Sequence, residues 1–376
     1  MESILNNTNY TEQDLLWLAR RQDTSKRAFL LVNPLQAKHV PSRPEAALEM
    51  MSAMGRMLAA EYPDTRLVIG FAETATAIGA VVAGCFPDGC VYLTTTREKL
   101  PEVADWVFFQ EEHSHATEQK LCGDGLRERL RNTGHVLFVE DELSTGRTMG
   151  NAVRQLRETC PDLPPVVAAS LLNRLSDENL DRLQALGVTC RWLVRIPEED
   201  YTPKVLRYTP QETVDCRGGA AEAVEEYHLN CPLPNPRIGA AIGLYRQRCG
   251  ELVKKALETV KDRLRGHVLV LGTEECMYPA LLLARAIEQT GTAVAVHATT
   301  RSPIAVSQDS PITNGYLMSS FYEKDRKTYV YNLQNYDTVL VLSDAVPANP
   351  DGPRDLAAAC GYWGVKPVFL YGGGHV

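Results

Sequence analysis

The chain has 376 residues, of which 44% are hydrophobic and 23% charged, and its formal net charge is −8. This length exceeds the size at which one hydrophobic core stops growing, so we expect two domains. The composition excludes a disordered or fibrous protein, and the negative charge argues against extended nucleic acid as a partner. Apolar runs are too short to span a bilayer and the first residues do not form a secretory signal, so we expect a cytoplasmic protein without membrane contact.

The first half alternates β-branched runs with helical patterns, which predicts a parallel sheet with helices on both faces. A short helix is expected at 176–186, because Ser176 and Glu178 form a start signal and Gly187 a stop signal. Residues 198–238 are rich in Pro and Gly, and we place the domain junction there. The predicted strands are 66–70, 91–95, 136–139, 166–172 and 188–196.

The second half predicts another α/β unit by the same pattern. We therefore expect one domain at 25–215 and a second at 232–376. The predicted helices are 240–265 and 279–289, and the predicted strands are 267–271, 293–298, 338–342 and 367–371.

One segment, Val136 to Thr148, carries the clearest chemistry. It places apolar residues before two acids and a Ser/Thr/Gly turn, and then enters a helical pattern. A buried strand delivers such a turn to the edge of the sheet, where backbone N–H groups and the helix dipole bind an anion. Gly146 permits close backbone approach, and neighbouring hydroxyls add donors. The phosphate-binding residues that we predict are Ser144, Thr145, Gly146, Arg147 and Thr148.

The two acids, Glu140 and Asp141, can accept hydrogen bonds from vicinal sugar hydroxyls. The alternative for the whole segment is an ordinary strand-to-helix connection, because Asp, Ser, Thr and Gly are common there as caps and turn formers.

This arrangement resembles the phosphoribosyl-pyrophosphate motif of type I phosphoribosyltransferases, including the orotate phosphoribosyltransferases. The resemblance implies phosphoribosyl pyrophosphate as a substrate, a nucleobase-like partner substrate, and catalytic roles for Glu140 and Asp141 with bound Mg²⁺. Two positions depart from the usual pattern, since Glu140 replaces the commoner Asp and Arg147 stands where Gly is frequent.

An upstream strand ends at Gly70 and leads into a helix start rich in small residues. In the family that this chain resembles, this position holds the pyrophosphate loop. We expect Gly70, Ala72, Glu73 and Thr74 to contact the substrate. The alternative is a close-packed helix, for which this glycine spacing is also typical.

The connection from 94 to 135 is long and contains His113 and His115. The resemblance implies a loop that closes over the reaction centre and excludes water, with these histidines as candidate catalytic residues. A metal site and a solvated surface loop are the alternatives, because two histidines alone lack further spaced ligands.

A segment at 32–44 precedes the predicted core as a substrate-selecting hood does in this superfamily. Lys38 and His39 are its candidate substrate-binding residues. An ordinary surface loop is the alternative.

The two halves share an order of motifs that suggests an internal duplication. The run Val68 to Glu73 corresponds to Val270 to Glu275, and the strand that ends at Asp141 corresponds to the strand that ends at Asp344. The residues after Asp344 contain no Ser/Thr-Gly cradle, so we expect no second 5-phosphate site. Chance likeness between α/β units is the alternative.

The run Thr-Thr-Arg-Ser-Pro at 299–303 resembles the TRSP domain, which is fused to phosphoribosyltransferases of bacterial tellurite-resistance-type stress systems. We expect a second-domain site at the carboxyl edge of the sheet. The two glutamates could equally be the first turn of a helix, where acids complement the dipole. The predicted residues are Glu274, Glu275, Arg301, Ser302 and Asp344.

Together these patterns predict an enzyme that transfers a 5-phosphoribosyl group between pyrophosphate and a nucleobase-like nitrogen, in either direction, in synthesis or salvage of a nucleoside-like metabolite. The alternative is a noncatalytic regulator that binds phosphoribosyl pyrophosphate or a nucleotide. Assembly as a homodimer is compatible with either hypothesis.

Overall fold

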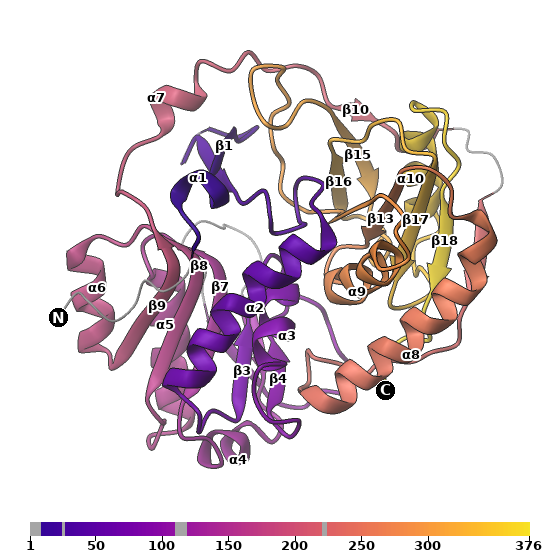
Figure 1. The fold of residues 1–376 in the computed structure, drawn as a ribbon. Helices are drawn as coiled ribbons and strands as arrows, with labels where there is room; N and C mark the ends of the chain where they lie inside the picture. Colours follow the sequence, from indigo (N-terminus) through magenta and orange to yellow (C-terminus); the bar gives the residue numbers. More distant parts are fainter. Residues whose placement is uncertain (1–8, 25–26, 110–118, 220–223) are drawn as a thin grey trace. The chain divides into compact units, whose positions relative to one another are not determined.

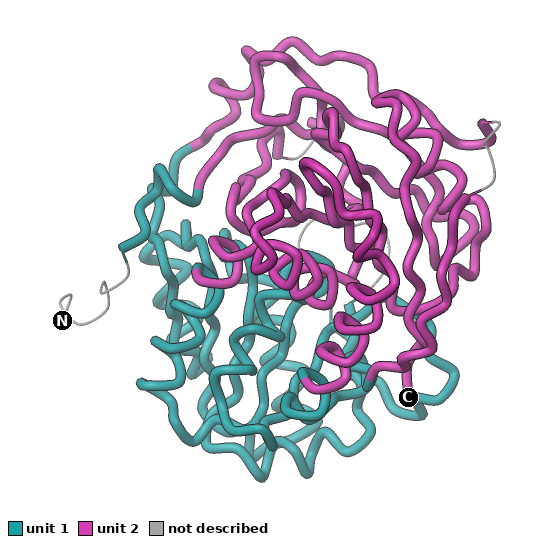
Figure 2. The backbone as a smooth tube through the Cα atoms, turned by 45° about the vertical axis from the view of Figure 1, so that its right-hand side comes forward, with its two compact units in different colours: residues 1–15, 50–199, 234–246 teal, residues 16–49, 200–233, 247–376 magenta. Residues whose placement is uncertain are grey.

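A computed structural model describes residues 9–24, 27–109, 119–219 and 224–376. The chain forms two compact units (Figure 2). No helix within these described ranges is long and apolar enough to cross a membrane. The first unit comprises Met1–Leu15, Met50–Glu199 and Pro234–Arg246, and the second unit comprises Leu16–Glu49, Asp200–Leu233 and Gln247–Val376.

A six-stranded sheet forms the centre of the first unit, in the order β12-β4-β3-β7-β8-β9. All neighbours are parallel except β12, which pairs antiparallel with β4. The predicted parallel sheet is therefore confirmed. The strands are β3 (Leu67–Gly70), β4 (Val91–Thr94), β7 (Val136–Leu143), β8 (Val166–Asn173), β9 (Val188–Arg195) and β12 (Ala240–Ala241).

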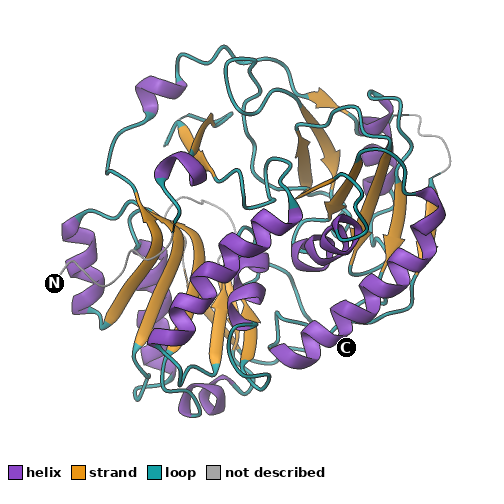
Figure 3. Ribbon diagram, viewed as in Figure 1, coloured by secondary structure: helices purple, strands orange, loops and turns teal. Residues whose placement is uncertain are grey.

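Helices flank this sheet (Figures 1 and 3). The predicted start at Ser176 is confirmed, because its hydroxyl accepts a hydrogen bond of 3.2 Å from the backbone N–H of Asn179. The helices are α1 (Glu12–Leu15), α2 (Pro44–Glu61), α3 (Thr76–Ala83), α4 (Leu126–Arg131), α5 (Arg147–Thr159) and α6 (Asp177–Ala185).

Both faces of the first sheet are buried. Ile69 and Phe138 pack in one core with Val153 of α5. The alternate residues Val68 and Val139 point to the opposite face and are also fully buried. This explains why the strands are continuous apolar runs, as parallel strands covered on both sides are.

The connection after β4 contains an antiparallel hairpin of β5 (Trp106–Phe109) and β6 (Gln119–Cys122). Val107 and Leu121 of this hairpin join the core beside α5. The sequence patterns predicted only a loop for this whole region, so the hairpin was missed.

The second unit is built on a five-stranded parallel sheet in the order β11-β18-β17-β13-β14. A three-stranded sheet, β10-β15-β16, packs beside it through Tyr316 and Val330. The strands are β10 (Val214–Asp215), β11 (Glu225–His228), β13 (Val268–Gly272), β14 (Val294–Ala298), β15 (Gly315–Ser319), β16 (Lys327–Tyr331), β17 (Thr338–Ser343) and β18 (Val368–Tyr371). The helices are α7 (Thr202–Val205), α8 (Ile242–Val260), α9 (Met277–Glu288) and α10 (Asp351–Gly361), with a 3-10 turn at Lys261–Arg263.

The segment 16–49 folds with the second unit. Its hairpin of β1 (Trp17–Arg20) and β2 (Phe29–Val32) shares a core with Ile304 and Ile312. Ser42 extends the edge of β14, because it exchanges two backbone hydrogen bonds of 3.0 Å with Val296. These partners are remote in sequence from the hairpin.

The two units share one plan. The order β4-β3-β7-β8-β9 corresponds to β14-β13-β17-β18-β11, and an antiparallel hairpin follows both β4 and β14 along the chain. Thr95 donates its backbone N–H to the carbonyl of Gly70 at 3.0 Å, and Thr299 donates to Gly272 at 2.9 Å. The matched order and bonds support the duplication predicted from the sequence.

Candidate functional site

The turn after β7 has the geometry expected for a phosphate cradle. Gly146 has a φ of 66° and directly precedes α5, so it occupies a left-handed conformation that favours glycine. Arg182 donates to the carbonyl of Thr145 at 2.6 Å and fixes the turn from α6. The first N–H groups of a helix have no partners within the helix, so the start of α5 can donate to an anion.

Asp141 connects this turn to the upstream loop. The hydroxyl of Thr74 donates to Oδ1 of Asp141 at 2.9 Å. Asp141 and its neighbour Glu140 are both half-buried at the end of β7. The structure thus brings together the two segments that were predicted separately to hold sugar and pyrophosphate.

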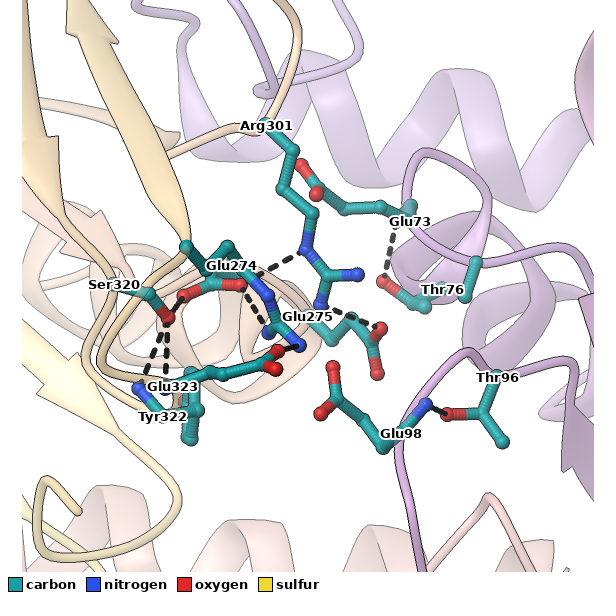
Figure 4. A network of polar contacts seen from close by, with 12 residues as sticks. Glu73, Thr76, Thr96, Glu98, Glu274, Glu275, Arg301, Ser320, Tyr322 and Glu323 are labelled. Atoms are coloured by element: carbon teal, nitrogen blue, oxygen red, sulfur yellow. Dashed lines mark hydrogen bonds and ion pairs between the residues drawn. The ribbon is translucent and has the colours of Figure 1, made fainter. Parts of the chain in front are cut away.

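The loop after β3 is fixed by backbone contacts. The N–H of Ala72 donates to the hydroxyl of Thr95 at 2.9 Å, and Nε2 of Gln119 donates to the carbonyl of Ala72 at 2.9 Å. Glu73 is buried, and its carbonyl accepts a bond of 3.2 Å from the Thr76 hydroxyl (Figure 4). Gln119 was missed, since its role depends on the unpredicted hairpin.

Gly70 also has a packing role. A Cβ on Gly79 would lie 3.1 Å from the Cα of Gly70 and 3.0 Å from the Tyr92 ring, so α3 and β3 approach closely here. The glycine spacing therefore serves close packing, as the alternative interpretation held, and this packing brings the loop of residues 71–74 to the edge of the sheet.

The remaining first-half candidates fall elsewhere. His113 and His115 lie outside the described residues. Lys38 is fully buried in the second unit, where its ammonium donates to the carbonyls of Glu274 and Thr299 at 3.0 Å each. The neighbouring His39 is buried in the same unit.

Glu140 and Asp141 have the right chemistry for Mg²⁺. Carboxylate oxygens are the ligands that Mg²⁺ prefers, and it is usually held by one or two carboxylates together with substrate phosphates. Among the described residues no group of three or more His, Cys, Asp or Glu side chains could hold a metal ion. The residues therefore fit an ion shared with a substrate rather than a cage made by the protein alone.

In the second unit, the predicted residues Glu275 and Arg301 belong to a polar network around Glu274 (Figure 4). This side chain is 1% exposed, and its Oε2 accepts bonds of 3.0 Å from both Arg301 and Arg326. Ser320 donates to the other carboxylate oxygen, and Arg301 also pairs with Glu275 at 3.3 Å. The backbone of Glu274 has a φ of 45°, a strained left-handed value for a non-glycine residue.

Asp344 joins the network from the end of β17. Its Oδ1 accepts from the Tyr322 hydroxyl at 2.8 Å, and its Oδ2 lies 2.9 Å from Nε2 of His375. Tyr322 also bonds Thr273 at 2.6 Å. Burial, followed by the Asp344 carboxylate, raises the pKa of Tyr322 well above its usual value, so the phenol stays protonated and donates.

Ser302 lies beside this network. Its backbone N–H donates to the Thr300 hydroxyl at 3.2 Å, and its carbonyl accepts from Tyr331 at 2.8 Å. Several residues of the network were not predicted from the sequence. The only signal for them is that their part of the second unit corresponds to the region of the β5–β6 hairpin in the first unit. The missed residues are Ser320, Tyr322, Arg326 and His375.

A parallel sheet whose central strand ends in two acids and a phosphate-type turn is the arrangement of a phosphoribosyltransferase. Residues 15–197 match the family model for phosphoribosyl transferases, and residues 237–357 match that of the TRSP domain C-terminal to this transferase. The chain therefore contains a phosphoribosyltransferase domain followed by a TRSP domain. The enzyme class predicted from the sequence is confirmed.

Several solved structures are similar to part of the chain. Adenine phosphoribosyl transferase from Trypanosoma brucei, solved with AMP, pyrophosphate and ribose-5-phosphate, is 17% identical, with 49% of this chain and 77% of that chain covered and a TM-score of 0.36. The Giardia lamblia APRTase, complexed with 9-deazaadenine, is 21% identical, with 49% of this chain and 95% of that chain covered and a TM-score of 0.36. Orotate phosphoribosyltransferase from Mycobacterium tuberculosis is 18% identical, with 39% of this chain and 70% of that chain covered and a TM-score of 0.24. No curated protein matches the chain.

Proposed function

We propose that the protein transfers the 5-phosphoribosyl group between pyrophosphate and a nitrogen of a nucleobase-like molecule, with Mg²⁺. The observation that carries this proposal is the hydrogen bond between Thr74 and Asp141, which joins the upstream loop to the strand that precedes the phosphate-type turn. One contiguous edge of the sheet thus offers acceptors for sugar hydroxyls and donors for two phosphate groups.

In this proposal each segment has one task. Residues 144–148 bind the 5-phosphate, Glu140 and Asp141 bind the ribose hydroxyls, and residues 70–74 bind the pyrophosphate. Glu140 and Asp141 would hold Mg²⁺ together with oxygens of the substrate, and the ion would supply positive charge to the leaving pyrophosphate. Because positive charge develops at the anomeric carbon during displacement, the rate depends mainly on positioning and on fixed charges around the reacting groups.

His113 and His115 complete the proposal as residues of the segment that closes over the substrates. The same number of residues separates Phe109 from Gln119 as separates Met318 from Thr328 in the second unit. We assign Lys38 and His39 to the support of the second unit, since their burial there leaves substrate selection to other residues. A cytoplasmic stress-response role and a homodimeric state belong to the same proposal.

Pyrophosphate release tests the proposed reaction. The intact protein is incubated with phosphoribosyl pyrophosphate, Mg²⁺ and a panel of nucleobases or cell extract. We expect Mg²⁺-dependent release that falls about 100-fold in Asp141→Asn, since the amide lacks the negative charge and has an NH₂ donor in place of one acceptor oxygen. The exposed Asp162→Asn is the matched control. Binding of phosphoribosyl pyrophosphate without release under any condition would favour the noncatalytic regulator instead.

A further inference from the structure

The loops after β3 and β13 are held at the same place in the two units. In the first unit the N–H of Ala72 donates to the Thr95 hydroxyl at 2.9 Å. In the second unit the N–H of Glu274 donates to the Thr299 hydroxyl at the same distance. The carbonyl of the same loop residue, Ala72 or Glu274, also accepts a hydrogen bond from a side chain. Because these donors come from different parts of the chain, the two loops depend on different elements.

The second unit takes its donor from the segment that runs beside its edge strand β14. The ammonium of Lys38 donates to the carbonyl of Glu274 at 3.0 Å. The backbone of the same segment pairs with the edge strand, because the carbonyl of Lys38 accepts from the N–H of Ala298 at 3.4 Å and Ser42 pairs with Val296. The loop of the second unit is therefore held by a residue that precedes α2.

The first unit has an equivalent segment beside its edge strand β4, but that segment offers no donor. The carbonyl of Pro236 accepts from the N–H of Thr94 at 2.9 Å, and β12 continues the pairing along β4. Thr94 occupies the position of Ala298, since each lies opposite the last glycine of the neighbouring strand. Pro236 therefore stands where Lys38 stands in the second unit, and a proline ring has no hydrogen-bond donor.

The first unit takes its donor from the β5–β6 hairpin instead. Gln119 is 1% exposed, and its Nε2 donates to the carbonyl of Ala72 at 2.9 Å. Its cross-strand partner Phe109 contacts the preceding loop residue, because the rings of Phe109 and Phe71 lie 5.9 Å apart in an edge-to-face arrangement. Both rings are buried in the core of the first unit. One cross-strand pair of the hairpin thus holds two consecutive residues of the loop.

We propose that Gln119 is a positioning residue of the transferase site, whose bond to Ala72 fixes the loop of residues 71–74 in the orientation that binds pyrophosphate. This inference rests on the transfer reaction proposed above. Gln119 acts through Ala72 rather than on the substrate. Donors stabilise the charge that develops on a leaving group only when they are held in place before the reaction. Loss of the bond therefore slows the reaction of phosphoribosyl pyrophosphate and leaves the binding of the nucleobase unaffected.

Steady-state kinetics of the full-length Gln119→Met protein test this role, because methionine keeps the length of the side chain and removes the amide. Pyrophosphate release is measured while phosphoribosyl pyrophosphate is varied, and then while the nucleobase that supports release is varied. We expect kcat/KM for phosphoribosyl pyrophosphate to fall about tenfold, with KM for the nucleobase unchanged. Thr328→Val is the matched control, since Thr328 holds the position of Gln119 in the hairpin of the second unit, and we expect it to change neither constant.

A wild-type kcat/KM in Gln119→Met overturns the proposal even if the variant melts at a lower temperature, because the bond then serves stability alone. If Gln119→Met does not fold, Phe109→Leu decides in its place, and we expect the same constant to fall a few-fold. A wild type that releases no pyrophosphate refutes the transfer reaction instead. Hydrogen exchange then still tests the contact, because we expect residues 71–74 to exchange faster in Gln119→Met than in the wild type. Unchanged exchange there overturns the positioning role.

Discussion

The two units use the same sheet and differ in the residues that come after their central strands. After β7 the first unit has a glycine in a left-handed conformation and the open start of α5. After β17 the second unit has Pro, Asn and Asp residues, and α10 is covered by the hairpin loop. The shared hydrogen bonds therefore belong to the fold that both copies have, whereas the turn after the central strand differs between them.

The largest effect on stability is expected from a substitution that breaks the polar network of the second unit. Glu274→Gln leaves two guanidinium groups facing a neutral amide in a buried setting, so we expect a loss of about 3–5 kcal/mol in the free energy of unfolding. Glu323→Gln is the control, because this exposed partner of Arg326 contributes little. Scanning calorimetry measures both. Equal effects of the two variants would show that Glu274 is not the centre of the network.

The next prediction compares the strand-end glycines. A Cβ on Gly272 would lie 2.5 Å from the carbonyl oxygen of Cys276, whereas one on Gly70 would lie 3.0 Å from that of Ala75. Gly272→Ala therefore forces a backbone shift, and we expect a loss of about 2–3 kcal/mol, against about 1 kcal/mol for Gly70→Ala. Thermal unfolding of the two variants measures the difference. The reverse order would contradict the tighter packing of the second unit.

Lys38 tests the dependence of the second unit on the segment 16–49. Lys38→Met keeps the length of the side chain and removes the ammonium, which leaves the carbonyls of Glu274 and Thr299 without this donor. We expect a loss of about 1–2 kcal/mol in stability. Lys324→Met, at an exposed position, is the control. Equal stability of the two variants would show that Lys38 does not stabilise the turn at Glu274.

The smallest expected effect is a pH dependence that distinguishes the second unit. Burial, with a further contribution from His39 and Lys38, lowers the pKa of His297 to about 3. The folded state keeps this histidine neutral, while the unfolded chain binds a proton below its ordinary pKa of 6.5. The contribution of the neutral His297 to the free energy of unfolding is therefore complete above pH 6.5 and is lost progressively as the pH falls from there towards 3.

Between pH 7 and about 5.5 this loss amounts to about 1 kcal/mol. We expect His297→Leu to remove that part of the pH dependence of thermal unfolding, and the exposed His228→Leu to leave it in place. An identical pH profile in the wild type and His297→Leu would contradict the neutral, buried state.

Much of the fold follows from local patterns in the sequence. Each continuous β-branched run became a parallel strand, and the acids and glycine of 136–148 marked the edge of the sheet before any contact was known. The hairpins were not predictable in this way. The strand Trp17–Arg20 is short and mixed in character, and it is stabilised by Ile304, a residue from the other end of the chain.

The candidate site residues likewise fall into those that a local pattern predicted and those that it did not. Asp141 and Thr145 belong to a contiguous motif with a physical signature, so they were predicted from sequence. Tyr322 and Arg326 carry no such signature, because their roles arise from a hairpin loop that meets strand ends remote in sequence. The destination of Lys38 in the second unit was equally beyond local reasoning, since burial of an ammonium depends on acceptors that only the folded chain provides.

The central claim is that only the first unit binds phosphoribosyl pyrophosphate, and calorimetric titration of this compound with Mg²⁺ into the intact protein tests it most directly. We predict one binding site per chain, with affinity reduced about 100-fold by Asp141→Asn and unchanged by the exposed Asp162→Asn. Two sites per chain, or one site that Asp141→Asn leaves intact, would contradict this assignment.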